Sequence, residues 1–519
     1  MSRMNRLLFA FTLAGFLLVL VGLSAHFGVR VAAAAPRALF VAPDGTGVAC
    51  TQAAPCSLAT ALAQANDGDT LYLAGGTYTG TGAAVVTLTQ SITLAGGWDG
   101  APTGPLNLNP ERYPSVLDGE RQRRVVYVDE KITATLDGLV IAHGNATGLT
   151  LDKCPYRPDG CGGGILAAFW SRLVVRDSVI TDNVAAITTR GYPTGTTGYG
   201  GGIALVDVAG ARVESSLIIS NAASLANNGM GGGLYVESIG TGDVVITANL
   251  ILSNTATTQQ VAGWGGGIAV HFAAPFISKN RIAYNRAPAG AGLYTWYDAW
   301  RGESLIADNV LTGNQGDHAA YLGHSAARFQ GNRVLRNATD AGLRIVYGED
   351  KPPVAVNNVI ARSGERAVVA YGSSQDPLTV TLVHNTLVGE GRGEGIYVGG
   401  YGGSVVTLAV TNTIVTGFGV GITSTLPASS TITADHVLFW ANADDGIRGT
   451  NPVDGDPRFL NPAEDDYRLA AGSAAIDAGV DAGVTEDFEG ESRPRGPAPD
   501  IGADEFWLWT TYLPVVRRE

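Results

Sequence analysis

The stretch GWGGGIAVHFAAPFISKNRIAYNRA, residues 263–287, decides the fold. It holds a run of glycines, two segments of alternating apolar residues, and two asparagines five residues apart. The two preceding stretches have the same layout: GMGGGLYVESIGTGDVVITANLILSNTA at 229–256 and GYGGGIALVDVAGARVESSLIISNAA at 198–223. Three consecutive copies of this length indicate a repeat and predict a solenoid.

The first asparagine of each pair marks the repeat beyond the glycine-rich copies. The segments around it alternate apolar and polar residues and have no helical period. Strands this short cannot bury a sheet face alone, but stacked coils give every strand a parallel neighbour. An inward asparagine at each bend can then bond to the next asparagine and to the turn backbone. The predicted ladder contains Asn249, Asn280, Asn309, Asn332, Asn358, Asn385 and Asn412, with His436 in the same place one coil later.

These GGGI…N.I..N.A coils resemble right-handed parallel β-helix proteins, the architecture shared with pectate lyases and related carbohydrate-active enzymes. Residues 39–80 are similar to the entry segment of many secreted members, in which a short amphipathic helix, here SLATALAQA at 57–65, plugs the open end. The segment YRLAAGSAAIDAGV at 467–480 resembles part of the closing module of bacterial surface proteins of the choice-of-anchor type. The resemblance implies an all-β, single-stranded right-handed parallel β-helix solenoid with an N-terminal helical cap. It implies no particular activity, because this fold hosts many functions.

The N-terminus has the layout of a secretory signal peptide, which we place at 1–35. Arg3 and Arg6 precede an apolar run at 7–23, and small residues follow at 32–35. The alternative is an uncleaved anchor helix, because the run approaches membrane-spanning length. No later run is long enough to cross a membrane, so we expect no span in the mature chain. The remaining predicted parts are an N-terminal cap at 36–75, coils at 76–450, a C-terminal module at 451–505 and an apolar, then basic, tail at 506–519. The tail is either a last strand or a surface-attachment signal.

Composition supports an exported protein that does not bind nucleic acid. The chain has 519 residues and a formal net charge of −13, and nucleic-acid binding depends on neutralising phosphates. Four cysteines form two local pairs, Cys50 with Cys56 and Cys154 with Cys161, and neither pair has zinc-site spacing. Outside the cytosol two short-loop disulfides are the simpler account. We therefore expect a secreted or cell-surface monomer.

A candidate binding face follows from the strand after each glycine corner. If the first residue of that strand points inward, the alternate residues face solvent. The predicted binding face contains Tyr235, Tyr294, Trp296, Asp298, Trp300, Arg301, Arg344 and Tyr371. Glu237, His271 and His324 fall in the same outward row as Trp296, and a glutamate beside a histidine is a usable acid/base pair. The alternative is that outward rows of a β-helix collect aromatic residues for stacking alone.

Metal and cofactor signatures are weak in this sequence. The clustered aspartates that pectate lyases use for calcium have no counterpart at the matching positions. The acidic segment at 451–466 carries enough carboxylates for calcium but lacks EF-hand spacing, and a solvated loop is the alternative. His143, His318, His384 and His436 stand singly. We expect no cofactor and no metal site.

Two functional hypotheses remain. The first is a non-catalytic protein that binds polysaccharide or an extracellular matrix through the outward face. The second is a polysaccharide lyase or glycoside hydrolase that acts at the Glu237–His324 face. The absence of a recognisable catalytic set favours the first.

Overall fold

The computed structural model describes residues 35–149, 154, 160–187, 197–238, 243–259, 262–298, 302–348, 351–426 and 428–507. Ala38–Glu519 form one compact unit and Met1–Arg37 another. The predicted signal peptide, Trp300, Arg301 and most of the predicted tail therefore lie outside the described residues. No helix within these ranges combines the length and apolarity that a membrane crossing requires.

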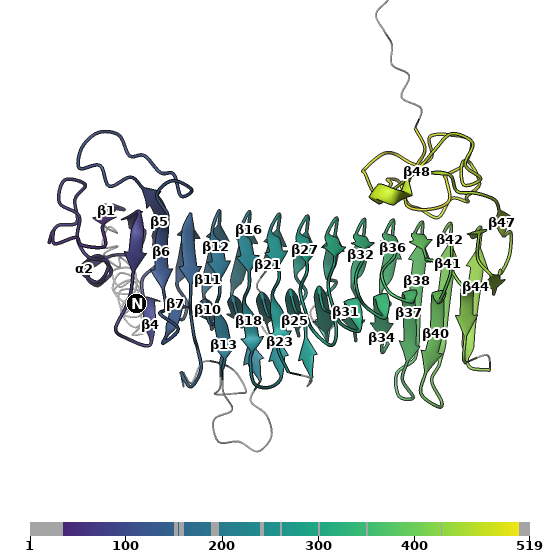
Figure 1. Ribbon diagram of the computed structural model, residues 1–519, viewed down its shortest axis with the longest axis horizontal. Helices are drawn as coiled ribbons and strands as arrows, with labels where there is room; N and C mark the ends of the chain where they lie inside the picture. Colours follow the sequence, from purple (N-terminus) through teal and green to yellow (C-terminus); the bar gives the residue numbers. More distant parts are fainter. Residues whose placement is uncertain are drawn as a thin grey trace, which may run out of the picture. The chain divides into compact units, whose positions relative to one another are not determined.

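Three long parallel sheets, stacked coil on coil, confirm the predicted right-handed parallel β-helix (Figure 1). Sheet I has 14 strands, from β1 (Ala38–Val41) to β44 (Ser430–Asp435). Sheet III also has 14, from β3 (Gly76–Tyr78) to β47 (Val453–Asp454). Sheet II has 13 strands: β4 (Ala84–Leu88), β7 (Arg124–Val128), β10 (Ile165–Ala168), β15 (Ile203–Val206), β20 (Leu234–Glu237), β25 (Ile268–His271), β28 (Leu293–Trp296), β31 (His318–Gly323), β34 (Ala341–Val346), β37 (Arg366–Gly372), β40 (Glu394–Gly400), β43 (Val420–Ser424) and β46 (Asp444–Gly446).

The predicted asparagine ladder occupies the corner between sheets I and III. Asn309 shows the pattern: its side chain donates to the Ile277 carbonyl at 2.9 Å and to Asn332 Oδ1 at 3.0 Å. Its own Oδ1 accepts from the backbone and side chain of Asn280, both at 3.0 Å. Each rung thus pairs buried amides that no water can reach. A second ladder at the next corner contains Asn183, Asn221, Asn254, Asn285, Asn314 and Asn337.

The ladder prediction is wrong for Asn412 and His436. The rung that follows Asn385 is Thr413, whose hydroxyl accepts from the Asn385 backbone at 3.4 Å. Asn412 precedes that rung and has a φ of 49°, in the left-handed region that asparagine tolerates well. His436, with a φ of 50°, takes the same place one coil later. Both adjacent residues, Asn412 and Thr413, are short and polar, so the pattern alone does not fix the register.

Two small sheets accompany sheet II in the first half of the solenoid, and one of them covers its outer face. One contains β13 (Val184–Ala186), β18 (Ala222–Ser224) and β23 (Thr255–Thr257), which run side by side in Figure 1. The other contains β14 (Gly198–Tyr199), β19 (Gly229–Met230) and β24 (Gly263–Trp264). Tyr199, Met230 and Trp264 of the second sheet pack on a second apolar cluster outside sheet II. The glycine-rich segments therefore form a corner of each coil and also carry side chains that cover the outer face of sheet II.

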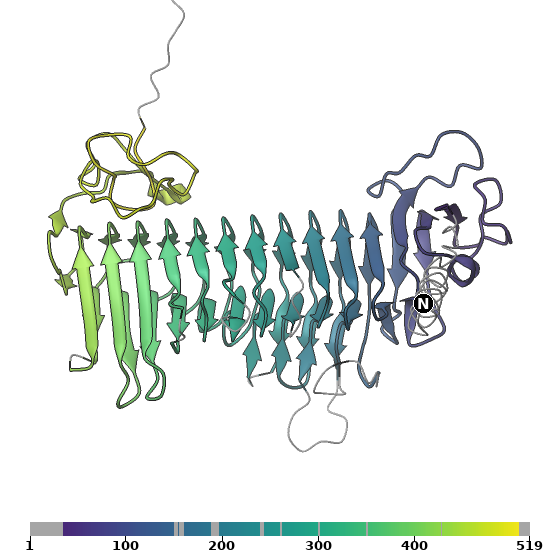
Figure 2. The ribbon, with the colours of Figure 1, turned by 180° about the vertical axis from the view of Figure 1, so that it is seen from behind.

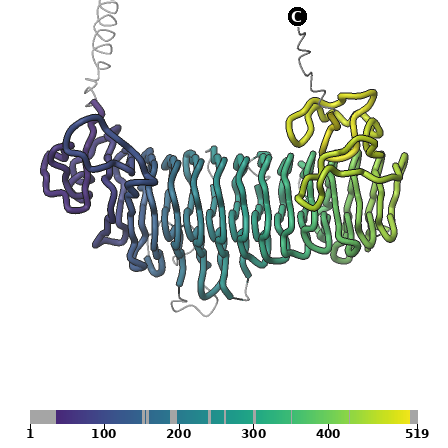
Figure 3. The backbone as a smooth tube through the Cα atoms, turned by 45° about the horizontal axis from the view of Figure 1, so that its top comes forward, coloured from purple at the N-terminus to yellow at the C-terminus, as the bar shows by residue number. Residues whose placement is uncertain are grey.

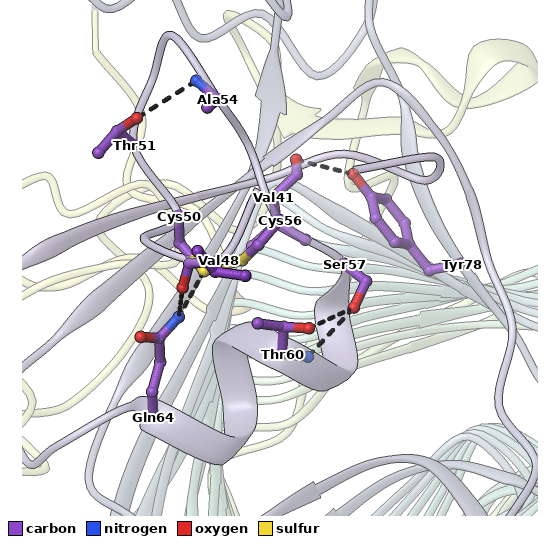
Figure 4. Close-up of a disulfide and its surroundings, with 10 residues drawn as sticks. All are labelled: Val41, Val48, Cys50, Thr51, Ala54, Cys56, Ser57, Thr60, Gln64 and Tyr78. Atoms are coloured by element: carbon purple, nitrogen blue, oxygen red, sulfur yellow. Dashed lines mark hydrogen bonds between the residues drawn. A yellow bond between two sulfur atoms is a disulfide. The ribbon is translucent and has the colours of Figure 1, made fainter. Parts of the chain in front are cut away.

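The N-terminal segment contains the predicted short helix and the first predicted disulfide (Figure 4). Helix α2 (Leu58–Gln64) begins after Ser57, whose hydroxyl accepts from the Thr60 backbone at 3.2 Å. Cys50 is bonded to Cys56, and Gln64 donates from the end of the helix to the Val48 carbonyl at 3.2 Å. The second predicted pair, Cys154 and Cys161, is also bonded. That α2 caps the solenoid stays a prediction.

The C-terminal segment packs on the outer face of sheet III (Figures 2 and 3). Its regular part is a hairpin of β48 (Phe459–Asn461) and β49 (Asp466–Leu469). Three successive corner residues of the solenoid bond to it: Asn357 to the Glu486 carbonyl at 2.6 Å, His384 to the Asp500 carbonyl at 3.1 Å, and Asn412 to the Val480 carbonyl at 2.6 Å. The domain boundaries and the choice-of-anchor resemblance stay predictions.

Candidate functional site

The first half of the predicted binding face is buried. Tyr235 is 1% exposed and Glu237 is 6% exposed, because the sheet of β14, β19 and β24 covers this part of sheet II. Tyr235 donates to Glu237 Oε2 at 2.6 Å, and burial raises the pKa of Glu237. His271 lies beside Glu237 on the next strand, and burial lowers its pKa to about 4. The prediction that Tyr235 and Glu237 face solvent is wrong, and no hydrogen bond joins Glu237 to His271 in the described part of the chain.

Two further predicted face residues are also buried. Tyr294 is 5% exposed and lies near Trp264 of the covering strand β24, with ring centroids 6.5 Å apart. Asp298 is fully buried, accepts from the Ser325 hydroxyl at 3.0 Å, and has a pKa raised to about 6 by burial. These contacts give Asp298 a structural place at the turn after β28.

The predicted register slips by one residue at β31. Tyr294 pairs with Tyr321 and Trp296 pairs with Gly323, so Tyr321 points outward and Leu322 belongs to the main core. His324 is therefore not in the row of Trp296. It follows the strand with a φ of 45°, at the corner between sheets II and I. The sequence HAAYLG is apolar on both faces, so alternation alone cannot assign them.

A stack of four rings follows that corner through successive coils. Phe272 stacks on Tyr297 at 5.2 Å, Tyr297 on His324 at 4.3 Å, and His324 on Tyr347 at 4.8 Å between ring centroids. All four residues have a positive φ, between 45° and 58°. The rings cover one another's faces, so His324 serves packing at this corner rather than an acid/base pair with Glu237.

The outer face of sheet II carries a pocket where the strands of the two small sheets have ended. It has a volume of about 210 Å³ and lies on β31, β34, β37 and β40, which follow one another along the solenoid (Figure 1). Arg344 and Tyr371 of the predicted face stand in it. The pocket is lined by Asp317, His318, Asp340, Ala341, Arg344, Arg366, Val369, Tyr371 and Tyr397.

Arg344 is held on two sides. Its guanidinium lies over the Tyr371 ring, 4.7 Å from the centroid, and Nη1 donates to His318 Nε2 at 3.2 Å. Burial and the neighbouring Arg344 charge lower the pKa of His318 to about 3, so this ring is neutral and its Nε2 accepts. His318 Nδ1 and Arg344 Nε are buried and have no hydrogen-bond partner in the described ranges. Buried polar atoms without a partner are rare in folded proteins, and each calls for an explanation.

Arg366 repeats this arrangement one coil later. Its guanidinium lies over the Tyr397 ring at 4.5 Å, and its Nε is 3.0 Å from Glu394 Oε2. Two tyrosine rings thus carry two guanidinium groups on adjacent strands. Such cation–π contacts hold a guanidinium in a fixed plane and leave its edge available for hydrogen bonds.

Two carboxylates lie directly before strands of this pocket: Asp317 precedes β31 and Asp340 precedes β34. They lie on consecutive coils, and the Asp340 backbone donates to the Asp317 carbonyl at 2.9 Å. Partial burial and the Asp340 charge raise the pKa of Asp317, while Arg344 lowers it. Both side chains are exposed, so a ligand can reach them.

Sequence reasoning missed Asp317, His318, Asp340 and Arg366. A signal for them exists, because an acidic residue precedes the sheet II strand in three successive coils: Asp317, Asp340 and Glu365. His318 was interpreted as a single histidine, and the slip at Tyr321 moved its strand out of alignment with β34. Aligning the two coils on Asp317 and Asp340 would have given the observed register, in which His318 pairs with Ala341.

The described residues contain no group of three or more His, Cys, Asp or Glu side chains placed to hold a metal ion. In the acidic segment considered for calcium, three carboxylates are engaged by arginines. Arg448 bonds to Asp454 at 2.7 Å, Arg336 to Asp465 at 2.7 Å, and Arg468 to Asp466 at 2.7 Å.

The comparison with protein families agrees with the observed fold. The family described as "Right handed beta helix region" matches residues 263–415. No curated protein sequence matches this chain. Among solved structures, "Crystal structure of pectate lyase Pel9A" is similar at 15% identity and a TM-score of 0.35, over 90% of this chain and 96% of that chain. "The complex structure of XylC with xylose" is similar at 11% identity and a TM-score of 0.45, over 90% and 98%. At these values neither structure bears on activity.

Proposed function

We propose that this protein binds an extracellular polysaccharide, and that the pocket around Arg344 holds one sugar unit. The observation that carries the proposal is the pair of arginine–tyrosine stacks, Arg344 on Tyr371 and Arg366 on Tyr397, beside Asp317 and Asp340. Sugar rings offer an apolar face for aromatic side chains and hydroxyl groups for charged ones. A volume of about 210 Å³ lies below the roughly 300–1,000 Å³ of sites for drug-sized ligands.

Extracellular residence is part of the proposal. The N-terminal sequence pattern predicts export, and two disulfides are typical of proteins in oxidising compartments. A rigid parallel sheet suits a long polymer, because side chains repeat from coil to coil at the spacing of the strands, roughly 4.8 Å.

Binding to a panel of soluble polysaccharides, measured by calorimetry or on a glycan array, tests the proposal. Arg344→Ala and Tyr397→Ala should each weaken binding of the best ligand at least tenfold. Arg344→Lys should not restore it, because an ammonium cannot replace a planar guanidinium stacked on Tyr371.

Matched controls lie on other faces of the solenoid. Tyr284 is 59% exposed at the corner that follows a sheet III strand, and Arg212 is an exposed arginine of sheet I. Tyr284→Ala and Arg212→Ala should leave binding unchanged. Equal losses in the pocket variants and the controls would place the site elsewhere, and a panel without any ligand would refute the proposal.

A second candidate function is glycoside hydrolysis at Asp317 and Asp340. The raised pKa of Asp317 beside Asp340 favours it, because glycosidases use one protonated and one ionised carboxyl group. Release of reducing ends from the bound polysaccharide, abolished by Asp317→Asn and by Asp340→Asn, would establish it. Binding without release would leave the protein a binding module.

A further inference from the structure

The charged side chains in and beside the pocket of the proposed binding site favour some classes of polysaccharide over others. Arg344 and Arg366 carry two positive charges, and Asp317, Asp340 and Glu394 carry three negative ones. His318 adds no charge at neutral pH, because its pKa is lowered to about 3. The chain as a whole has a net charge of −13. Neither the pocket nor the surrounding field therefore attracts an anion.

Neither guanidinium offers its Nε–H group to a carboxylate. A bidentate contact needs two parallel N–H groups of one guanidinium. Arg344 Nε is buried, and Arg344 Nη1 already donates to His318. Arg366 Nε is buried and faces Glu394 at 3.0 Å. The side-on fork, formed by Nε and one Nη group, is thus closed on both arginines, and a carboxylate would have to meet the terminal Nη groups.

The remaining groups suit hydroxyls. Asp317 and Asp340 are exposed acceptors on adjacent coils, and the outer N–H groups of the arginines are donors on the same and the neighbouring strand. A sugar hydroxyl both donates and accepts, so neighbouring hydroxyls can bond to a carboxylate and a guanidinium at once. The Tyr371 and Tyr397 rings supply apolar surface beside these groups.

We infer that the pocket takes a neutral sugar unit, recognised through neighbouring hydroxyls, and rejects uronic acids. This inference rests on the proposed polysaccharide binding at the same pocket and adds the class of sugar to it. It rests on a carboxylate-lined pocket in which the side-on fork of each arginine is closed.

Calorimetry with oligosaccharides of one length tests the inference on the full chain. Neutral oligomers of glucose, xylose and mannose are compared with oligogalacturonate, each at low and high salt. At least one neutral oligomer should bind at least tenfold more tightly than oligogalacturonate, with little change on adding salt, because no net charge is neutralised. Arg344→Ala should abolish that binding, and Tyr284→Ala should not.

Asp340→Asn provides a second readout. This variant should weaken binding of the neutral oligomer, since an amide is a poorer acceptor than a carboxylate. It should strengthen binding of oligogalacturonate, because a like charge is removed. Asp317→Asn repeats the test at the neighbouring coil, and circular dichroism checks that both variants fold.

Tighter, salt-sensitive binding of oligogalacturonate that is lost in Arg344→Ala would overturn the inference and keep the proposed site. Absence of binding by every oligomer, or binding indifferent to Arg344, would overturn the proposed site as well.

Discussion

The Trp296 indole lies directly on Gly323 of the next coil. A Cβ at Gly323 would come within 2.3 Å of the indole Cε3 atom and 2.5 Å of Cζ3. The pairing of Trp296 with Gly323 therefore has a steric reason, and it is the contact that fixes the register of β31 against β28. Residue 323 must be small because the ring of the preceding coil fills the space above it.

We expect Gly323→Ala to lower the free energy of unfolding by about 1–3 kcal/mol, the usual cost of overpacking. Gly402→Ala is the control, because a Cβ there meets nothing within 4 Å. In the double variant Trp296→Ala/Gly323→Ala the clash is gone, so its loss should be smaller than the sum of the two single losses. Thermal and urea unfolding measure the native protein, Gly323→Ala, Trp296→Ala, the double variant and the Gly402→Ala control. Additive losses would show that the indole does not lie on Gly323.

The asparagine ladder makes a second prediction. Asn309→Ala should leave the Ile277 carbonyl and the Asn280 amide groups without partners, in a place water cannot reach. The expected cost is about 1–3 kcal/mol of unfolding free energy, and Asn332→Ala should behave alike. Asn107→Ala, on an exposed loop, is the control. Losses within about 0.5 kcal/mol in both ladder variants, the usual range for surface changes, would contradict the ladder.

The fold was predictable because one signal, the repeat, recurs in nearly every coil. The ladder residues from Asn249 to Asn385 could be named because each sits between apolar residues that fix its phase. Asn412 could not, because Asn412 and Thr413 are both short and polar and either can fill a rung. What decides between them is tertiary: Asn412 bonds to the C-terminal segment, and no coil pattern reports that contact.

The candidate site was predictable only where the face is open. Arg344 and Tyr371 stand in the pocket, whereas Tyr235, Glu237 and Tyr294 are buried beneath the covering strands. The cover comes from side chains such as Met230 and Trp264, each directly before a glycine run interpreted as a corner alone. Alternation identifies the two faces of a strand, but it does not show that a second layer lies on the outer one.

Asn412 should anchor the C-terminal segment rather than the coils. Its side chain donates to the Val480 carbonyl at 2.6 Å and accepts from the Val480 backbone at 3.0 Å. We expect Asn412→Ala to raise hydrogen exchange and protease sensitivity across 475–505 while the coil strands keep their protection. Lys279→Ala is the control, since Lys279 has the same corner conformation and is exposed. Loss of protection spread through the coils would instead restore Asn412 to the ladder.

The C-terminal segment should also respond to pH through Asp504. This side chain is 5% exposed and accepts from the Leu469 backbone at 2.7 Å. Burial, with the nearby charges of Asp487 and Glu489, raises the pKa of Asp504 from 3.8 to about 7 in the folded protein. The folded state therefore holds a proton that the unfolded chain releases near its ordinary pKa. The stability contributed by Asp504 is fully present below about pH 4 and is lost as the pH rises to about 7.

Asp504→Asn removes this titration while its amide oxygen still accepts from Leu469. The variant and the native protein should be close in stability near pH 4. The variant should then gain relative stability by at most roughly 1.4 kcal/mol per pH unit, and the gain should level off above about pH 7. Thermal unfolding of both proteins in matched buffers measures the difference, in which groups common to both cancel. Asp466→Asn is the opposite control: the Arg468 hydrogen bond lowers the pKa of Asp466 from 3.8, so this variant should lose relative stability as the pH rises to about 4 and should show no further change above it. A difference for Asp504→Asn that stays constant or shrinks with rising pH would mean that Asp504 is already ionised in the folded protein.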